Sequence, residues 1–154
     1  MPKSPPPAAR RTEGTRAVLD TNVVVSGFLT AGGAPARLLA LIPAGILIPV
    51  YSDAIIAEYE EVLSRPRLAI DRHAAEAFLG ALRDEGSRVT PLREENVRLP
   101  DPDDYAFILA ARAAACPVVS GNLRHYPADC GVEAISPARF FARLDPSRPR
   151  GANE

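Results

Sequence analysis

Acidic side chains stand at several points of this sequence where an apolar run begins or ends. Asp20 directly follows Val18 and Leu19 and precedes three valines, so a charged group lies between two segments that should both be buried. Burying a carboxylate is costly unless a metal ion or hydrogen-bond donors compensate for the lost water. Asp20 is therefore interpreted either as a metal ligand or as a cap on a following helical turn. Capping by Asn22 is compatible with metal binding by Asp20.

A second set of acids lies on a helix predicted for residues 52–64. Its apolar stripe consists of Ile55, Ile56, Tyr59, Val62 and Leu63. Glu58 and Glu60 flank this stripe on opposite edges, whereas Glu61 points further away and is expected to be solvated. Helical periodicity does not choose between Glu58 and Glu60 as a site residue.

Three further acids, Asp101, Asp103 and Asp104, stand at the start of a helix predicted for residues 103–115. The positive end of a helix dipole favours carboxylates, so capping alone accounts for one or two of them. Asp104 differs because it shares a helix face with apolar residues that should press on the sheet, namely Phe107, Ile108, Ala111 and Ala115. A carboxylate heading a buried stripe needs a metal ion or a donor. For Asp101 and Asp103, capping and a functional role are equally consistent with the pattern.

Converging carboxylates suggest one kind of chemistry in particular. Hard divalent ions such as Mg²⁺ prefer oxygen ligands and retain several waters, so two to four acids make a sufficient site. Such ions can neutralise developing charge, activate a bound water and stabilise a leaving oxygen, which suits phosphodiester cleavage. The sequence contains no Ser-His-Asp order, HExxH motif or P-loop that would favour another chemistry.

The elements that must position these acids alternate along the chain. Short β-branched apolar runs predict strands at 17–19, 46–51, 88–91, 117–120 and 133–135. Stretches of helical period predict a helix that opens near Pro35 and others at 52–64, 74–85, 103–115 and 137–144. This order is typical of an α/β fold with a mainly parallel sheet, whose ligand site lies beyond the carboxyl ends of the strands. Polar residues occupy those ends at 20–22, 52–53 and 121–125.

Length and composition limit the alternatives. The chain of 154 residues suits one domain, predicted for residues 16–145, with disordered tails at 1–15 and 146–154. It lacks an apolar run long enough for a membrane span or a secretory signal, so we expect a cytoplasmic protein without membrane contact. Cys116 and Cys130 form no CxxC pair and are expected to be packing residues. A net charge of −1 means that any nucleic-acid contact must be local.

Four motifs in order resemble the PIN-domain nucleases over residues 16–144. They are Val-Leu-Asp20-Thr-Asn, Glu58 in a helix after Tyr-Ser-Asp-Ala, Asp-Pro-Asp-Asp104 ahead of Phe-Ile-Leu-Ala-Ala, and Ser-Gly-Asn-Leu-Arg-His-Tyr-Pro at 120–127. The last, together with Ser-Pro-Ala-Arg-Phe at 136–140, is similar to the group identified as toxin components of toxin-antitoxin systems.

The resemblance implies a three-layer α/β/α sandwich, Mg²⁺ or Mn²⁺ as cofactor, and RNA as substrate. By position, Asp20, Glu58 and Asp104 match the metal-binding acids of the family, and Asn122 stands where many members have a fourth acid. Asn122 can still ligate through its amide oxygen, but it brings no charge. Asn22, Asp101, Asp103 and Ser120 are further site candidates, and Arg124 and His125 are candidates for phosphate contacts.

The leading hypothesis is a metal-dependent ribonuclease that acts as a toxin and is restrained by a protein antitoxin; a homodimer is a further expectation. The alternative is a non-catalytic PIN-like module that binds RNA or serves as a scaffold, as Asn122 and the acidic net charge suggest. A phosphatase or phosphotransfer domain ranks last, because the Asp-Thr-Asn segment lacks a second Asp and the only lysine is Lys3.

Overall fold

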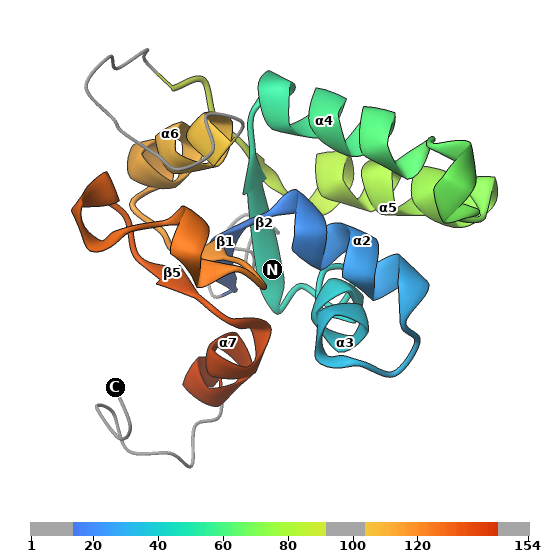
Figure 1. Ribbon diagram of the computed structural model, residues 1–154, viewed down its shortest axis with the longest axis horizontal. Helices are drawn as coiled ribbons and strands as arrows, with labels where there is room; N and C mark the ends of the chain where they lie inside the picture. Colours follow the sequence, from blue (N-terminus) through green and yellow to red (C-terminus); the bar gives the residue numbers. More distant parts are fainter. Residues whose placement is uncertain (1–13, 92–103, 145–154) are drawn as a thin grey trace, which may run out of the picture.

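The computed structural model describes residues 14–91 and 104–144, which form a parallel sheet flanked by helices (Figure 1). Its strands are β1 (Thr15–Leu19), β2 (Leu47–Tyr51), β3 (Ser87–Arg88), β4 (Val118–Val119) and β5 (Ala134–Ile135). They are hydrogen-bonded in the order β3-β2-β1-β4-β5, and every pair is parallel. All five predicted strands occur, although β3 ends at Arg88, where the predicted strand 88–91 begins. The sheet already begins at Thr15, inside the predicted N-terminal tail, and the remaining predicted tail lies almost entirely outside the described residues.

Helices lie on both sides of the sheet. They are α2 (Thr21–Leu29), α3 (Ala34–Ala40), α4 (Asp53–Leu63), α5 (Arg72–Glu85), α6 (Tyr105–Ala114) and α7 (Pro137–Leu144). Short 3₁₀ turns occur at η1 (Pro66–Leu68), η3 (Leu123–His125) and η4 (Ala128–Cys130). In Figure 1, α2, α3, α4 and α5 lie on one side of β2, whereas α6 lies on the other. This arrangement confirms the predicted three-layer α/β/α sandwich.

The sequence pattern predicts only a single helical turn after Asp20, whereas the structure has a full helix there, α2. Its β-branched residues lose side-chain freedom in a helix, which lowers their helix propensity. Burial outweighs that cost, because Val23 and Val24 are both removed from solvent in the core. The side chain of Asp20 caps the helix by accepting a hydrogen bond from the backbone N–H of Asn22. Asp20, and not Asn22, is therefore the cap.

The predicted apolar stripe of α6 is confirmed except at its last member. Phe107, Ile108 and Ala111 are buried against the sheet, and α6 packs on β1, β2 and β4. Ala115 is exposed because it lies one residue past the end of the helix in a left-handed conformation, with φ of 53°. That conformation turns its side chain out of the helical register.

The strand order places one particular crevice at the centre of the sheet. From β1 the chain adds β2 and then β3 on one side, and it later returns to add β4 and β5 on the other side of β1. The direction of winding therefore reverses between β1 and β4. In parallel sheets ligands bind beyond the carboxyl ends of strands at such a reversal. Asp20 follows β1 and Ser120 follows β4, so both residues lie at this point.

Both cysteines are free, Cys130 buried and Cys116 half-buried. Burial raises the pKa of the Cys116 thiol to about 11, so its reactive thiolate form is disfavoured. In the described part of the chain, no single helix combines the length and apolar character of a membrane span, although α2 and α3 together meet that test across a bend of 100°.

The contact between α5 and β2 provides a stability test. A methyl group added at Gly86, which follows α5, would lie 2.4 Å from the carbonyl oxygen of Leu82 and 2.7 Å from that of Pro49. Gly86→Ala is therefore expected to lower the free energy of unfolding in urea by about 1–3 kcal/mol. Gly80→Ala, in the same helix but with open space around the new methyl group, should instead raise it by about 0.5–1 kcal/mol. Equal effects at the two positions would contradict this packing.

Candidate metal centre

The carboxylate of Asp20 is buried, with 4% of the residue exposed, and is held from two sides. Its Oδ2 atom accepts hydrogen bonds from the hydroxyls of Ser120, at 2.8 Å, and Tyr126, at 2.9 Å. Its Oδ1 atom accepts a longer bond, 3.4 Å, from the backbone N–H of Asn22. Asp20 therefore both caps α2 and lies in the candidate site. The better-satisfied oxygen is Oδ2, so Oδ1 retains more capacity for a further partner.

Tyr126 is a site residue that the sequence reasoning missed. Burial raises the pKa of its hydroxyl far above the ordinary value, and the negative charges of Asp20 and Asp104 raise it further. The hydroxyl therefore stays protonated and donates to Asp20. A signal was available, because a buried tyrosine hydroxyl needs a hydrogen-bond partner and Tyr126 lies in the polar loop after β4. Which group accepts this hydrogen bond, however, depends on the path of that loop in the folded chain.

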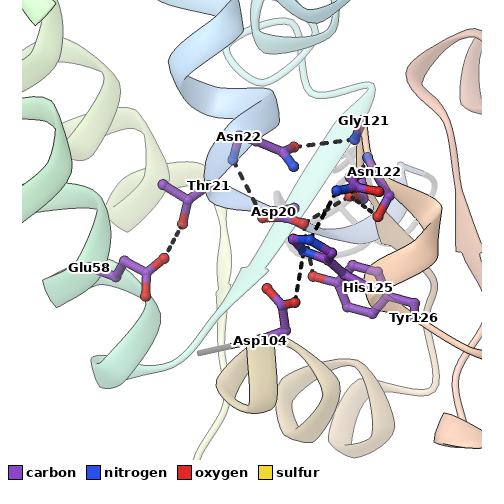
Figure 2. Close-up of polar contacts among 10 residues, drawn as sticks. Asp20, Thr21, Asn22, Glu58, Asp104, Gly121, Asn122, His125 and Tyr126 are labelled. Carbon is purple, nitrogen blue, oxygen red and sulfur yellow. Dashed lines mark hydrogen bonds and ion pairs between the residues drawn. The ribbon is translucent and has the colours of Figure 1, made fainter. Parts of the chain in front are cut away.

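Asp104 lies at the N-cap position of α6 and is 5% exposed, as its place at the head of the apolar stripe predicts. Its side chain makes no capping hydrogen bond to the helix. Instead, its Oδ2 atom lies 2.9 Å from Nδ1 of His125. The carboxylate is thus directed toward the loop after β4 and toward Asp20 (Figure 2).

Asp20, Asp104 and His125 form a group that could hold a cation. Each contributes one donor atom, and these atoms lie within 4.8 Å of one another. Within residues 14–91 and 104–144 no other such cluster of three His, Cys, Asp or Glu side chains occurs. Two buried carboxylates repel each other and are costly to desolvate, and a divalent ion would offset both effects. Two carboxylates and one imidazole form a donor set that fits such an ion.

Glu58 lies beside this group without being one of its three members. It is half-buried, and its Oε2 atom accepts a hydrogen bond of 2.5 Å from the hydroxyl of Thr21, the residue after Asp20 (Figure 2). Glu60 is exposed and forms an ion pair of 2.7 Å with Arg83 on α5. Glu61 is exposed and pairs with Arg65, so its predicted solvated position is confirmed. Tertiary structure therefore separates Glu58 from Glu60, which helical periodicity could not do.

The loop after β4 brings the remaining candidates to the same edge. The side-chain oxygen of Asn22 accepts a hydrogen bond of 3.2 Å from the backbone N–H of Gly121, which fastens α2 to this loop. The side-chain nitrogen of Asn122 lies 2.9 Å from Nε2 of His125. Arg124 is exposed next to His125. Asp101 and Asp103 lie outside the described residues.

The bond from Tyr126 to Asp20 generates a prediction. Tyr126→Phe removes a hydroxyl that orients a candidate ligand, and losing such a partner typically weakens metal binding about 10–100-fold. We expect a loss of this size in the Mn²⁺ dissociation constant measured by calorimetry. Tyr59→Phe is the matched control, because the hydroxyl of this buried tyrosine donates to the backbone carbonyl of Leu19 and not to a carboxylate. Both variants should lose stability, but only the first should lose affinity; equal affinities would contradict the assignment.

Comparison with known proteins agrees with this geometry. A family model described as the PIN domain matches residues 16–124, a range that contains Asp20 after β1, Glu58 in α4 and Asp104 at the N-cap of α6. A search of curated proteins found no match. PIN domains are typically nucleases and generally use divalent metal ions. The match covers well over half of the chain, and the chain therefore belongs to the PIN-domain family.

Proposed function

We propose that this protein is a metal-dependent endoribonuclease and that it acts as the toxin of a toxin-antitoxin pair. One observation carries the proposal: donor atoms of the buried Asp20 and Asp104 and of the partly buried His125 converge at the reversal of the sheet, in a chain of a nuclease family. RNA as substrate and a protein antitoxin as partner are supported by the resemblance of residues 120–127 and 136–140 to the toxin group.

Different residues of the chain would have different roles in such a reaction. Asp20 and Asp104 would hold the ion, with Glu58 beside them through Thr21. A bound Mg²⁺ or Mn²⁺ supplies charge neutralisation at phosphorus and a water of lowered pKa. Ser120 and Tyr126 keep the Asp20 carboxylate in one orientation. Arg124, which is exposed next to His125, would contact a phosphate locally, because a chain without a net positive charge offers no long-range attraction for RNA.

A second candidate function has a specific observation in its favour. Residues 120–127 contain no carboxylate, and the side chain of Asn122 is engaged with His125. A site with fewer acids could bind RNA without cutting it. The discriminating experiment incubates purified protein with a pool of labelled RNAs, with Mn²⁺, with Mg²⁺ and with chelator. Cleavage that needs the ion supports the nuclease; RNA binding without cleavage in every condition supports the non-catalytic module.

The toxin role is tested in cells. Expression of the unaltered chain should arrest growth, and co-expression of a short neighbouring reading frame that encodes an antitoxin should relieve the arrest. Expression that leaves growth unaffected in the native host, while the purified protein cuts RNA, would reject the toxin role and retain the nuclease.

We expect Asp20→Asn to abolish metal-dependent RNA cleavage while leaving the fold intact or more stable. The substitution removes one charge from a cluster of acids, which relieves repulsion in the metal-free protein. Asn is also about as good a helix cap as Asp, so α2 should keep its start. Cleavage assays and thermal unfolding in the presence of chelator measure the two effects. Loss of activity together with unfolding would show that Asp20 acts mainly as a cap.

We expect Glu58→Gln to reduce the turnover number far more than Glu60→Gln, by about 100-fold against less than about twofold, because a carboxylate beside the reacting centre acts electrostatically. Glu60 is the matched control, since it lies two residues away on the same helix and its only described partner is the exposed Arg83. Single-turnover cleavage at saturating Mn²⁺ separates turnover from ion binding. Similar rates for the two variants would remove Glu58 from the site.

A further inference from the structure

We propose that His125 is a direct ligand of the metal ion, that Asn122 holds the ring in place, and that this nitrogen donor makes the centre favour Mn²⁺ over Mg²⁺. The proposal rests on the proposed function, because it concerns the same site. The family match ends at Arg124, so the position of His125 in the structure carries the argument.

The placement of the imidazole nitrogen fits a ligand. Nδ1 of His125 lies 2.9 Å from Oδ2 of Asp104, and one donor atom of each of these residues lies within 4.8 Å of a carboxylate oxygen of Asp20. Neighbouring ligands around an octahedral ion, at about 2.1 Å from it, are separated by about 3.0 Å, and opposite ligands by about 4.2 Å. The contact between Nδ1 and Oδ2 matches the spacing of neighbouring ligands, and the limit of 4.8 Å for the whole group is close to the largest separation that one coordination shell allows. The ring is two-thirds buried, with 31% of its side chain exposed, so an ion bound there would retain access to water.

Asn122 provides the outer support that a ligating histidine needs. Its side-chain nitrogen lies 2.9 Å from Nε2, the ring atom that points away from Asp104. Metal-bound histidines usually donate this second N–H to a carbonyl or carboxylate, which fixes the ring orientation. An amide can present either its NH₂ group or its oxygen to Nε2. With an ion at Nδ1, the ring N–H would lie at Nε2, and the amide oxygen of Asn122 would accept a hydrogen bond from it.

The loop that carries both residues is fastened to the acids. The hydroxyl of Ser120 accepts a hydrogen bond of 3.0 Å from the backbone N–H of Asn122 and donates its own proton to Asp20. The side chain of Asn22 binds the backbone N–H of Gly121. His125 is thus placed relative to Asp20 through short chains of hydrogen bonds, which preorganises the shell before an ion arrives.

The donor set determines which ion is preferred. Mg²⁺ strongly favours oxygen ligands and gives up its waters reluctantly, whereas transition-metal ions accept imidazole more readily. Because Asn122 stands at the position of a fourth acid, the ring of His125 supplies a further donor without adding negative charge. A nitrogen donor in place of an oxygen donor weakens Mg²⁺ binding more than Mn²⁺ binding.

Electron spin-echo spectroscopy of bound Mn²⁺ tests the proposal directly, because it detects a ligating imidazole nitrogen without any substrate. The chain contains two histidines, His125 and the exposed His73 in the first turn of α5, so the full chain must be measured free of a histidine tag. We expect a strong ¹⁴N coupling in the unaltered protein and in the control His73→Gln. We expect it to be absent in His125→Gln, with Mn²⁺ affinity reduced at least about tenfold.

Two more measurements separate a ligand from a merely structural histidine. Asn122→Ala should keep the ¹⁴N coupling but weaken Mn²⁺ binding about tenfold, as loss of an outer partner does. His125→Asp should lower the ratio of the Mg²⁺ to the Mn²⁺ dissociation constant. Because His73→Gln leaves the site untouched and retains one imidazole, its spectrum decides the question even if the His125 variants fold poorly.

The outcomes distinguish this inference from the function on which it rests. Mn²⁺ that binds to the unaltered protein and is lost in Asp20→Asn, but shows no imidazole coupling, would overturn the role of His125 and leave the nuclease proposal standing. Absence of Mn²⁺ binding to the unaltered protein would overturn both.

Discussion

A buried carboxylate at the end of a central strand needs several partners at once, and Asp20 obtains them from two separate parts of the chain. Ser120 and Tyr126 donate from the loop after β4, about 100 residues away in sequence, while the start of α2 supplies a backbone N–H. The burial cost of the charge is met only when β1, β4 and α2 are all in place. The same bonds leave Oδ1 with one long hydrogen bond, from Asn22, so the interaction that joins the elements also leaves a carboxylate oxygen with capacity for a further partner.

The parallel sheet explains why acids from distant segments meet there. Parallel strands present their carboxyl ends at one edge, and the reversal between β1 and β4 leaves room at that edge for a ligand. Asp104 arrives from α6, which packs beneath these strands, and Glu58 arrives from α4 through its bond to Thr21. A concentration of negative charge at a buried edge is unfavourable by itself, and it becomes favourable when a cation is bound.

Other acids near the sheet and on α4 form ion pairs with arginines on the surface of the protein. Asp53 pairs with Arg88, which holds its pKa below the usual range, and Glu61 pairs with Arg65 with the same effect. Glu60 contacts Arg83. These exposed ion pairs contribute little to stability. Asp53, Glu60 and Glu61 are thus held on the surface by arginines, whereas the described hydrogen bonds to the carboxylates of Asp20 and Glu58 come from hydroxyl groups and, at Asp20, from a backbone N–H as well.

The sequence by itself determined the alternation of strands and helices, the acids at the strand ends, and the burial of Asp104. These features follow from periodicities of two and 3.6 residues and from a general rule about parallel sheets, all of which can be read locally. Tertiary structure decided the helical state of α2, the separation of Glu58 from Glu60, the hydroxyl of Tyr126 on Asp20, and the contact between His125 and Asp104. Each of these depends on burial against, or contact with, a distant segment, and local sequence patterns contain no information about how a loop directs its side chains across such a distance.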